Sequence, residues 1–398
     1  MADGSADRQA SGREYDVVLF GATGFTGELT ARYLARHAPA TARIALAGRN
    51  RAKLETLRAG LAETNPGWSD LPLLHADVGD AASLRAVAAS TQVVITTVGP
   101  YLLHGEPLVA ACAETGTDYV DLSGEPEFVD DMYLRHHARA VETGARIVHA
   151  CGFDSIPYDL GVLYTVARLP DDVPVDITGA IRASATFSGG TFQSALGAFS
   201  RLRSMQRTAA ARRKADPRPA GRTVRTPTGR PHRDAGTGRW LVPLPTLDPQ
   251  IVGRSAAALP VYGPDFTYRH YADVKRLPTI VAAGAGMAVL FAAAQIPPAR
   301  KALGSLRKNG DGPSARQRAK SWFSLRLVGT AGGERVVTEV SGGDPGYDET
   351  AKMLGESALC LAFDDLPATS GQLTPAVAMG EPLVERLVRA GITFRVIG

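Results

Sequence analysis

The first 150 residues alternate short apolar runs with longer segments whose apolar residues recur at helical spacing. The short runs are rich in aliphatic residues, as is typical of parallel strands covered on both faces. We expect strands at 15–20, 43–47, 72–75, 92–98, 118–122 and 146–150, and helices at 26–37, 51–61, 81–89, 107–115 and 126–142. This alternation predicts an α/β fold with a Rossmann-type, doubly wound parallel sheet.

The regular alternation stops at Cys151, and the pattern beyond it is mixed. We expect strands at 176–185, 322–328 and 334–341, and helices at 189–199, 348–363 and 380–390. Because 398 residues exceed the usual size of a single core, two domains are expected. The predicted boundaries give a disordered leader at 1–13, the Rossmann domain at 14–150, a second α+β domain at 151–345 and C-terminal helices at 346–398.

Two segments of the second domain have unusual composition. Residues 201–239 hold twelve Lys or Arg against only Asp216 and Asp234, with several prolines and glycines, and we interpret them as a long loop or poorly ordered insertion. Residues 277–296 are nearly uncharged and flanked by cations. A buried or interface helix, a membrane-surface contact and a membrane span are all compatible with that length and those flanks.

Composition excludes several classes of protein. The chain is 44% hydrophobic and 21% charged, as in ordinary globular proteins, and a net charge of +4 does not indicate nucleic-acid binding. Three isolated cysteines argue against a disulfide framework and a zinc site, and no metal-ligand spacing occurs. We expect a cytoplasmic protein, with peripheral contact to the inner face of the cell membrane through 277–296 as the alternative.

The glycines at 21, 24 and 27 follow the first strand and open the first helix. Phosphate binding requires backbone N–H groups at a helix start and no side chain in the way, which glycine permits. A lone glycine motif is weak evidence, but the strand–turn–helix context is the required one. We predict that the turn binds a dinucleotide through Gly21, Thr23, Gly24, Phe25, Thr26 and Gly27.

The end of the second strand indicates NADP rather than NAD. An acidic residue there would bind the ribose 2′-hydroxyl of NAD, but the sequence reads Gly48-Arg49-Asn50, with Lys53 one turn further on. A guanidinium can pair with the 2′-phosphate and stack on adenine, although Arg49 could also be a solvated loop charge. Further predicted cofactor contacts are Asp77, for which a helix N-cap is the alternative, and Thr97, Gly99 and Pro100 beside the topological switch point.

The motifs FGATGFTG, AGR, TTVGPY, GTDYVDLSGE, ACGFDSIPYDLG and SGGDPGYDETAKML together resemble the saccharopine dehydrogenase-like oxidoreductases. Within that group, the chain is most similar to the mycobacterial trans-acting enoyl reductases. The resemblance covers 15–163 densely and 336–396 moderately. It implies NADP(H) as cofactor, a mixed second domain, C-terminal helices that pack back on the Rossmann domain, and saturation of a carbon–carbon double bond in a polyketide-derived lipid chain.

Reduction of an enoyl thioester needs a donor for the enolate oxygen and a proton source for the α-carbon. Tyr101, Asp154 and Tyr158 are the candidate catalytic residues. Each has a structural alternative: Tyr101 as a packed ring, and the segment around Tyr158 as a helix start capped by Ser155 or Asp159. Tyr347 either closes over the site or packs a turn.

Three functions stay open at this point. The first is an NADPH-dependent enoyl reductase acting in trans on a lipid-like acyl chain held by an acyl carrier protein or polyketide synthase. The second is an amine or imine oxidoreductase of the saccharopine dehydrogenase type, and the third is a non-catalytic, lipid-associated NADP-binding protein. The basic segment could receive an acidic carrier protein, although a solvated charge run is the simpler interpretation. A homodimer is compatible with the sequence, which does not determine the oligomeric state, and nucleic acid is not expected as a partner.

Overall fold

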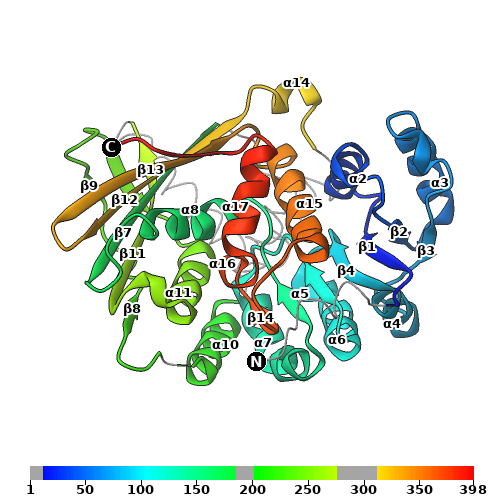
Figure 1. Cartoon of the computed structure of the whole chain (residues 1–398), viewed down its shortest axis with the longest axis horizontal. Helices are drawn as coiled ribbons and strands as arrows, with labels where there is room; N and C mark the ends of the chain where they lie inside the picture. Colours follow the sequence, from blue (N-terminus) through cyan, green and yellow to red (C-terminus); the bar gives the residue numbers. More distant parts are fainter. Residues whose placement is uncertain (1–11, 185–200, 218, 276–311) are drawn as a thin grey trace. The chain divides into compact units, whose positions relative to one another are not determined.

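The apolar runs of the N-terminal region pair as parallel strands in the computed structural model, which describes residues 12–184, 201–217, 219–275 and 312–398. The chain forms two compact units (Figure 1). Unit 1 comprises Met1–Phe153 and Tyr347–Ala390, and unit 2 comprises Asp154–Gly346 and Gly391–Gly398. Each unit is built around a sheet of its own.

The sheet of unit 1 has seven parallel strands in the order β14-β6-β5-β4-β1-β2-β3. The first six follow the Rossmann order, in which the direction of winding reverses between β1 and β4. This confirms the predicted fold class; the seventh strand, which comes from the C-terminal part of the chain, was not predicted. The strands are β1 (Tyr15–Phe20), β2 (Ile44–Gly48), β3 (Leu73–His75), β4 (Thr91–Thr96), β5 (Asp118–Val120), β6 (Arg146–Val148) and β14 (Gly371–Leu373).

Local sequence signals set the ends of the helices in unit 1. Asn50 and Asp80 cap the helices that follow β2 and β3, and Pro126 opens the longest helix, which ends at Gly144 with a φ of 79°. The helices are α2 (Phe25–His37), α3 (Arg51–Ala62), α4 (Ala81–Ser90), α5 (Tyr101–His104), α6 (Glu106–Thr115), α7 (Pro126–Thr143), α15 (Asp348–Phe363), α16 (Pro375–Ala378) and α17 (Gly380–Arg389), with a 3-10 turn at η1 (Pro66–Trp68).

The helix α15, orange in Figure 1, belongs to unit 1 although it lies far along the sequence. It packs against α2, against strand β4 and against α17. Its side chains from Met353 to Leu361 are almost continuously buried, as expected of a helix covered on several sides. The C-terminal segment therefore contributes to the core of the N-terminal sheet.

Unit 2 contains a mixed sheet in the order β15-β13-β12-β7-β11-β10-β9, with β8 pairing β11. The two long strands predicted at 322–328 and 334–341 are antiparallel neighbours, as expected. The last strand, β15, pairs with β13, whereas only helices were expected in the C-terminal segment. The strands are β7 (Val175–Ser184), β8 (Thr223–Arg225), β9 (His232–Arg233), β10 (Trp240–Pro243), β11 (Asp265–Val274), β12 (Trp322–Ala331), β13 (Glu334–Gly342) and β15 (Thr393–Val396).

Two helices of unit 2 pack against its sheet and against each other: α8 contacts β12 and β13, and α11 contacts β11 and α8. Residues 201–239, expected as a loop or poorly ordered insertion, instead contain the helix α10 and the strands β8 and β9. That expectation was wrong because the charge count was given more weight than the helical spacing of the alanines and arginines. The helices are α8 (Ile156–Val166), α10 (Leu202–Ala215), α11 (Asp248–Ala258) and α14 (Ala315–Arg318), with η2 (Pro260–Tyr262).

Some sequence expectations fall outside the described residues, namely the helix at 189–199, the apolar segment 277–296 and the leader up to residue 11. Arg13, expected in the leader, is in fact anchored: its guanidinium donates to the carbonyls of Thr115 (2.7 Å) and Gly116 (3.1 Å). Among the helices that the structure describes, none is long and apolar enough to cross a membrane.

Candidate functional site

The turn between β1 and α2 is held by close backbone packing. Gly21 has a φ of 86°, which favours glycine, and its carbonyl accepts the N–H of Gly24 (3.0 Å) and the hydroxyl of Thr97 (3.1 Å). A Cβ at Gly27 would overlap the Gly21 carbonyl oxygen and lie 2.8 Å from the Thr97 hydroxyl. Glycine is therefore required at 21 for the turn and at 27 for the approach of the helix to the turn.

Gly24 differs from the other two glycines. It is exposed, and a Cβ there would meet only the Gly21 carbonyl, at 3.4 Å. Gly24 is also the N-cap residue of α2, and no side chain caps this helix start. A helix start with an open, uncapped glycine turn fits a bound pyrophosphate, because backbone N–H groups and the helix dipole both favour an anion there. The turn thus fits the predicted dinucleotide.

The loop after β4 lies beside the glycine turn, since β1 and β4 are neighbours at the switch point. Thr97 donates its N–H to the carbonyl of Phe20 (3.1 Å), in addition to its hydroxyl bond to Gly21. The Gly99–Pro100 peptide bond is cis, and Pro100 is the N-cap of α5. The structure brings together the turn and three predicted cofactor contacts, Thr97, Gly99 and Pro100, at the carboxyl edge of the sheet, where α/β folds bind their ligands.

Arg49 and Lys53 are both exposed at the end of β2, and neither forms an ion pair with a described residue. Asn50 instead uses its side-chain oxygen to accept the N–H of Lys53 (3.0 Å), so it caps α3. Arg51, by contrast, is engaged by Glu55 (2.9 Å) and by the carbonyl of Leu73 (2.9 Å). Two cations are therefore available to a 2′-phosphate while the neighbouring arginine is not.

The structure corrects the alternative considered for Asp77. Asp80, not Asp77, caps α4, by accepting the N–H groups of Ala82 (3.1 Å) and Ser83 (3.2 Å). Asp77 accepts the N–H of Gly79 (2.9 Å) and thereby closes the turn after β3. Asp77 lies just after β3, and the adenine contact predicted for it stays a prediction.

Tyr101 is a packed, hydrogen-bonded ring. Its hydroxyl donates to the carbonyl of Thr96 (3.1 Å) and accepts the N–H of Leu122 (3.1 Å), and the side chain is buried. Burial raises the pKa of this hydroxyl well above its ordinary value. A hydroxyl whose donor and acceptor roles are both used by the backbone favours the structural alternative over proton donation.

Buried acids at this edge of the sheet were missed in the sequence. Glu125 accepts the N–H groups of Tyr101 (3.1 Å) and Leu102 (3.0 Å), so its carboxylate sits at the start of α5. Asp121 accepts from Ala150 N–H (2.9 Å) and contacts Nδ1 of His149 at 2.7 Å. The motif DLSGE, which holds both acids at the end of β5, was the available signal.

Within unit 1, the C-terminal segment contacts both the glycine turn and the loop that follows β6. The ring of Tyr347 meets the ring of Phe25 edge to face, with centroids 4.8 Å apart. The hydroxyl of Thr350 accepts the N–H of Phe153 (3.1 Å). Tyr347, for which both a closing role and a turn-packing role were considered, therefore packs against Phe25 of the glycine turn.

The other two candidate catalytic residues belong to unit 2. Asp154 is exposed at the start of this unit, whereas Tyr158 is buried in the first turn of α8. Ser155 is the N-cap residue of α8, but its side chain makes no capping bond; it donates to the carbonyl of Asp154 (2.6 Å) instead. The expected side-chain cap by Ser155 was therefore wrong.

Tyr158 is part of a buried polar cluster that the sequence did not reveal. Its ring lies edge to face with that of His270, with centroids 4.8 Å apart. The Nδ1 atom of His270 is 2.9 Å from the hydroxyl of Tyr268, and its Nε2 atom is 3.6 Å from Oδ2 of Asp248. These residues come from α8, α11 and β11, so no local motif could have predicted the cluster.

Burial dominates the ionisation of this cluster. It lowers the pKa of His270 to about 4, and it raises the pKa of Asp248 well above its ordinary value, helped by the nearby Asp154 carboxylate. Burial also raises the pKa of Tyr158, with Asp248 adding to the effect. At neutral pH, Tyr158 and His270 are therefore both uncharged, and the tyrosine keeps its proton.

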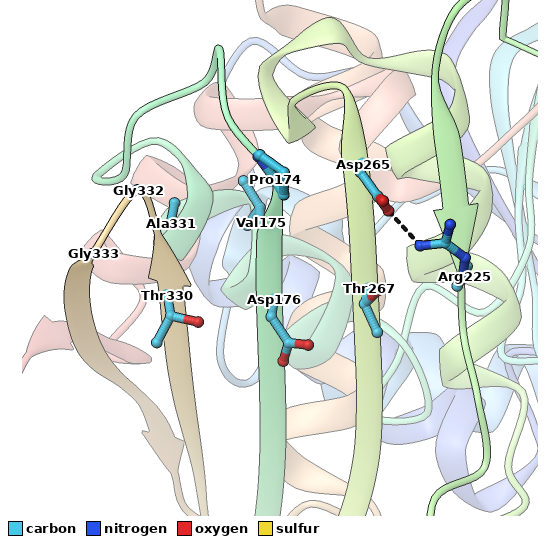
Figure 2. A pocket seen from close by; sticks show the side chains of 10 residues that line it. All are labelled: Pro174, Val175, Asp176, Arg225, Asp265, Thr267, Thr330, Ala331, Gly332 and Gly333. Atoms are coloured by element: carbon cyan, nitrogen blue, oxygen red, sulfur yellow. Dashed lines mark hydrogen bonds and ion pairs between the residues drawn. The ribbon is translucent and has the colours of Figure 1, made fainter.

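A cavity of about 250 Å³ opens at one end of the unit 2 sheet (Figure 2). Asp176 and Asp265 come from adjacent parallel strands, Thr330 comes from β12, and Gly333 comes from the β12–β13 turn. Figure 2 shows that Asp265 is engaged by Arg225, with 2.6 Å between the charged atoms. None of the predicted site residues lines this cavity.

Comparison with known proteins agrees with this geometry. The family model of the saccharopine dehydrogenase NADP binding domain matches residues 17–148. A Mycobacterium tuberculosis protein provisionally named a trans-acting enoyl reductase is 40% identical over 97% of this chain and 98% of its own. The trans-acting enoyl reductase of Mycobacterium leprae is 37% identical over 96% of this chain and 97% of its own.

Among solved structures, apo saccharopine dehydrogenase (L-Glu forming) from Saccharomyces cerevisiae matches with a TM-score of 0.56. It covers 96% of this chain and 100% of its own at 13% identity, so it shows a shared fold. The full-length similarity to the mycobacterial proteins and the match to the NADP-binding domain are more specific. The chain belongs to the trans-acting enoyl reductase family, and it is an NADP-dependent oxidoreductase with a saccharopine dehydrogenase-type fold.

Proposed function

We propose that this protein reduces the carbon–carbon double bond of an enoyl thioester whose acyl chain is carried by a separate polyketide synthase. The observation that carries the proposal is the 37–40% identity to trans-acting enoyl reductases over nearly the whole chain, together with a glycine turn whose geometry fits a dinucleotide. The names of those relatives supply the reaction and the words "in trans", and the turn supplies the cofactor site.

The reaction divides its needs between the cofactor and the chain. When bound, NADPH supplies the hydride for the β-carbon and leaves as NADP⁺. The glycine turn would hold the pyrophosphate, and Arg49 with Lys53 would hold the 2′-phosphate. The electron pair of the double bond moves onto the carbonyl oxygen, and an acid of the chain then delivers a proton to the α-carbon, which completes the saturated thioester.

Tyr158 is the proposed acid. Its raised pKa keeps the hydroxyl protonated at neutral pH, and its ring is fixed by the edge-to-face contact with His270. Tyr101 is unsuited because its hydroxyl is committed to Thr96 and Leu122. Asp154, four residues earlier and exposed, is the second candidate.

The test follows NADPH oxidation at 340 nm with an enoyl thioester and, in parallel, with a cyclic imine. We expect turnover of the thioester, with a product 2 Da heavier. Tyr158→Phe should lower kcat by about 10²- to 10⁴-fold, as removal of a general acid does, without changing the Kd of NADPH.

Tyr164→Phe is the matched control, because Tyr164 lies on the same helix and its hydroxyl reaches only the carbonyl of Phe394 at 3.5 Å. Turnover within twofold of the wild type in Tyr158→Phe would remove Tyr158 from the mechanism. Oxidation with the imine alone would replace the proposed reaction by amine chemistry, and tight NADPH binding without oxidation would indicate a non-catalytic protein.

A further inference from the structure

The basic segment 201–239 contains two kinds of cation. Several are used inside unit 2: Arg212 pairs with Asp216 (2.5 Å), Arg225 pairs with Asp265, and Arg222 donates to the carbonyls of Ala256 (2.7 Å) and Leu259 (2.9 Å) at the end of α11. These side chains hold the fold together. They are not available to a partner.

Three of the remaining cations share one face of α10, the helix so labelled in Figure 1. Arg203, Arg207 and Lys214 are exposed, and their spacing of four and seven residues places them within about 40° of one another around a 3.6-residue helix. Arg213, also exposed, flanks them, and α10 has no acidic residue. The buried Arg212 lies on the opposite side. We call Arg203, Arg207 and Lys214 the α10 basic stripe.

This stripe differs from several helices of unit 1. Arginines on those helices have an acidic partner one turn away, as in Arg32–Glu28 (2.8 Å), Arg51–Glu55 (2.9 Å) and Arg139–Glu142 (3.0 Å). Within the described parts of the chain, the three stripe residues form no ion pair. Like charges four residues apart destabilise a helix, so the stripe lowers the stability of α10 where a Glu would raise it.

We propose that the α10 basic stripe docks an acidic surface of the protein that carries the acyl substrate. This inference rests on the proposed function, which requires the chain to meet a carrier in trans. Three cations spread over about 16 Å of helix match a surface of the size of one helix. Exposed charges of this kind chiefly raise the association rate, and salt screens them with a Debye length of about 8 Å at physiological ionic strength.

A protein partner is favoured over a membrane. A helix that lies in a membrane interface pairs its cations with large exposed apolar residues. The exposed large apolar side chains of the described residues are Leu103, Leu134, Val141, Trp322, Val388, Val396 and Ile397, and none lies on α10. Among the α10 residues whose side chains are described, the stripe therefore offers charge without an exposed apolar face.

The experiment measures binding of a fluorescent phosphopantetheinylated carrier domain, taken from a polyketide synthase of the same organism, by anisotropy at 0.05 M and 0.5 M NaCl. We expect Arg203→Glu/Arg207→Glu/Lys214→Glu to raise the Kd at least about tenfold at low salt, and the difference to shrink at high salt. The alanine triple variant should show a smaller loss. If the glutamate variant does not fold, the alanine variant alone tests the contribution of the stripe to carrier binding.

The control reverses three exposed cations of the same unit, Arg316→Glu/Lys320→Glu/Arg335→Glu, and should leave the Kd within twofold. For the stripe variant, kcat/KM should fall with carrier-bound enoyl substrate and stay unchanged with the same acyl group on free pantetheine. That split separates docking from chemistry.

Equal carrier binding by the wild type and both stripe variants would overturn the proposal. In a parallel measurement with vesicles of phosphatidylglycerol and phosphatidylcholine, the proposal would also fail if the variants lost binding to the vesicles and kept binding to the carrier. If no thioester is reduced, the proposed function fails. The anisotropy measurement still decides the docking surface, because it does not depend on turnover.

Discussion

The glycine turn of unit 1 and the polar cluster of unit 2 are built in opposite ways. The turn uses backbone atoms of seven consecutive residues, 21–27, and one hydroxyl from the neighbouring β4 loop. The cluster uses side chains of Tyr158, Asp248 and His270, which three separate elements bring together. One site is encoded locally, and the other exists only after the chain has folded.

This difference sets how each site responds to change. At Gly27 the turn has almost no room for a side chain, because the helix backbone there lies against the backbone of Gly21, which cannot rotate away. The cluster is less sensitive to changes in side-chain shape. It holds ionisable groups out of water, however, and its stability is therefore sensitive to pH. Substitutions in the turn should act through steric overlap, and those in the cluster through protonation.

The largest effect is expected from Gly27→Ala. The added Cβ would overlap the Gly21 carbonyl oxygen, which is backbone and cannot move without opening the turn. We expect the affinity for NADPH to fall at least about 100-fold and the fold to lose roughly 1–3 kcal/mol. Fluorescence titration with NADPH and the thermal midpoint measure the two effects.

Gly60→Ala is the control for that substitution, because its Cβ would meet only the end of the Arg32 side chain, at 3.8 Å. Gly24→Ala should keep the fold, since the added methyl group would meet only the Gly21 carbonyl oxygen, at 3.4 Å. It should still weaken NADPH binding, because the methyl group would keep the pyrophosphate away from the backbone of the turn. Wild-type affinity in Gly27→Ala would mean that the turn is not the phosphate site.

The next effect concerns pH and the cluster. Burial lowers the pKa of His270 to about 4, against about 6.5 in the unfolded chain, so the unfolded state binds the extra proton first as pH falls. The histidine therefore contributes stability that is present above pH 6.5 and is lost toward pH 4. From pH 8 to pH 5 the loss is about 2 kcal/mol, which urea unfolding followed by tryptophan fluorescence can measure.

His270→Phe should remove this part of the pH dependence. Asp248, whose pKa is raised, contributes with the opposite sign, as its stability is present at low pH and lost as pH rises. Asp248, Tyr158 and Tyr268 remain in both the wild type and His270→Phe. The difference between the two proteins in the slope of unfolding free energy against pH therefore reports the contribution of His270. Equal slopes in the two proteins would contradict a neutral, buried histidine.

A smaller effect is expected from Arg49→Ala, which tests the proposed side-chain contact of the unit 1 site with the 2′-phosphate. Loss of a charged hydrogen bond to the 2′-phosphate should weaken NADPH about 10-fold and leave NADH nearly unchanged. Lys53→Ala should act in the same direction with less effect. Arg51→Ala is the control, since Arg51 is held by Glu55 and Leu73. A parallel loss for both nucleotides would refute the phosphate contact.

The sequence predicted unit 1 well because its information is local. The strand at Tyr15–Phe20 and the helix at Asp348–Phe363 were expected with the observed bounds. Glycine spacing, apolar runs and helix caps are all readable within one turn or strand. The return of β14 to this sheet was not predicted, since three residues at Gly371–Leu373 carry no pattern of their own.

The sequence predicted unit 2 poorly in the basic segment 201–239, where the many charged residues suggested a loop. Twelve cations in 201–239 suggested a loop, although the run of Leu202–Ala215 is a helix with one buried arginine. Whether an arginine is engaged also depends on distant partners such as Asp265, which pairs with Arg225 from a neighbouring strand and is brought there by tertiary packing. For the same reason, no sequence pattern joined Tyr158 to His270.

The position of β14 has a consequence for the order in which the protein assembles during synthesis. Its strand partner β6 is complete by Val148, but Gly371–Leu373 is synthesised only after residues 149–370. Until then, the growing chain holds a six-strand sheet with an unpaired edge and lacks the buried helix α15, a form prone to self-association. Slow elongation between these points, or a chaperone that shields the β6 edge, would decide how much of the product reaches the native state.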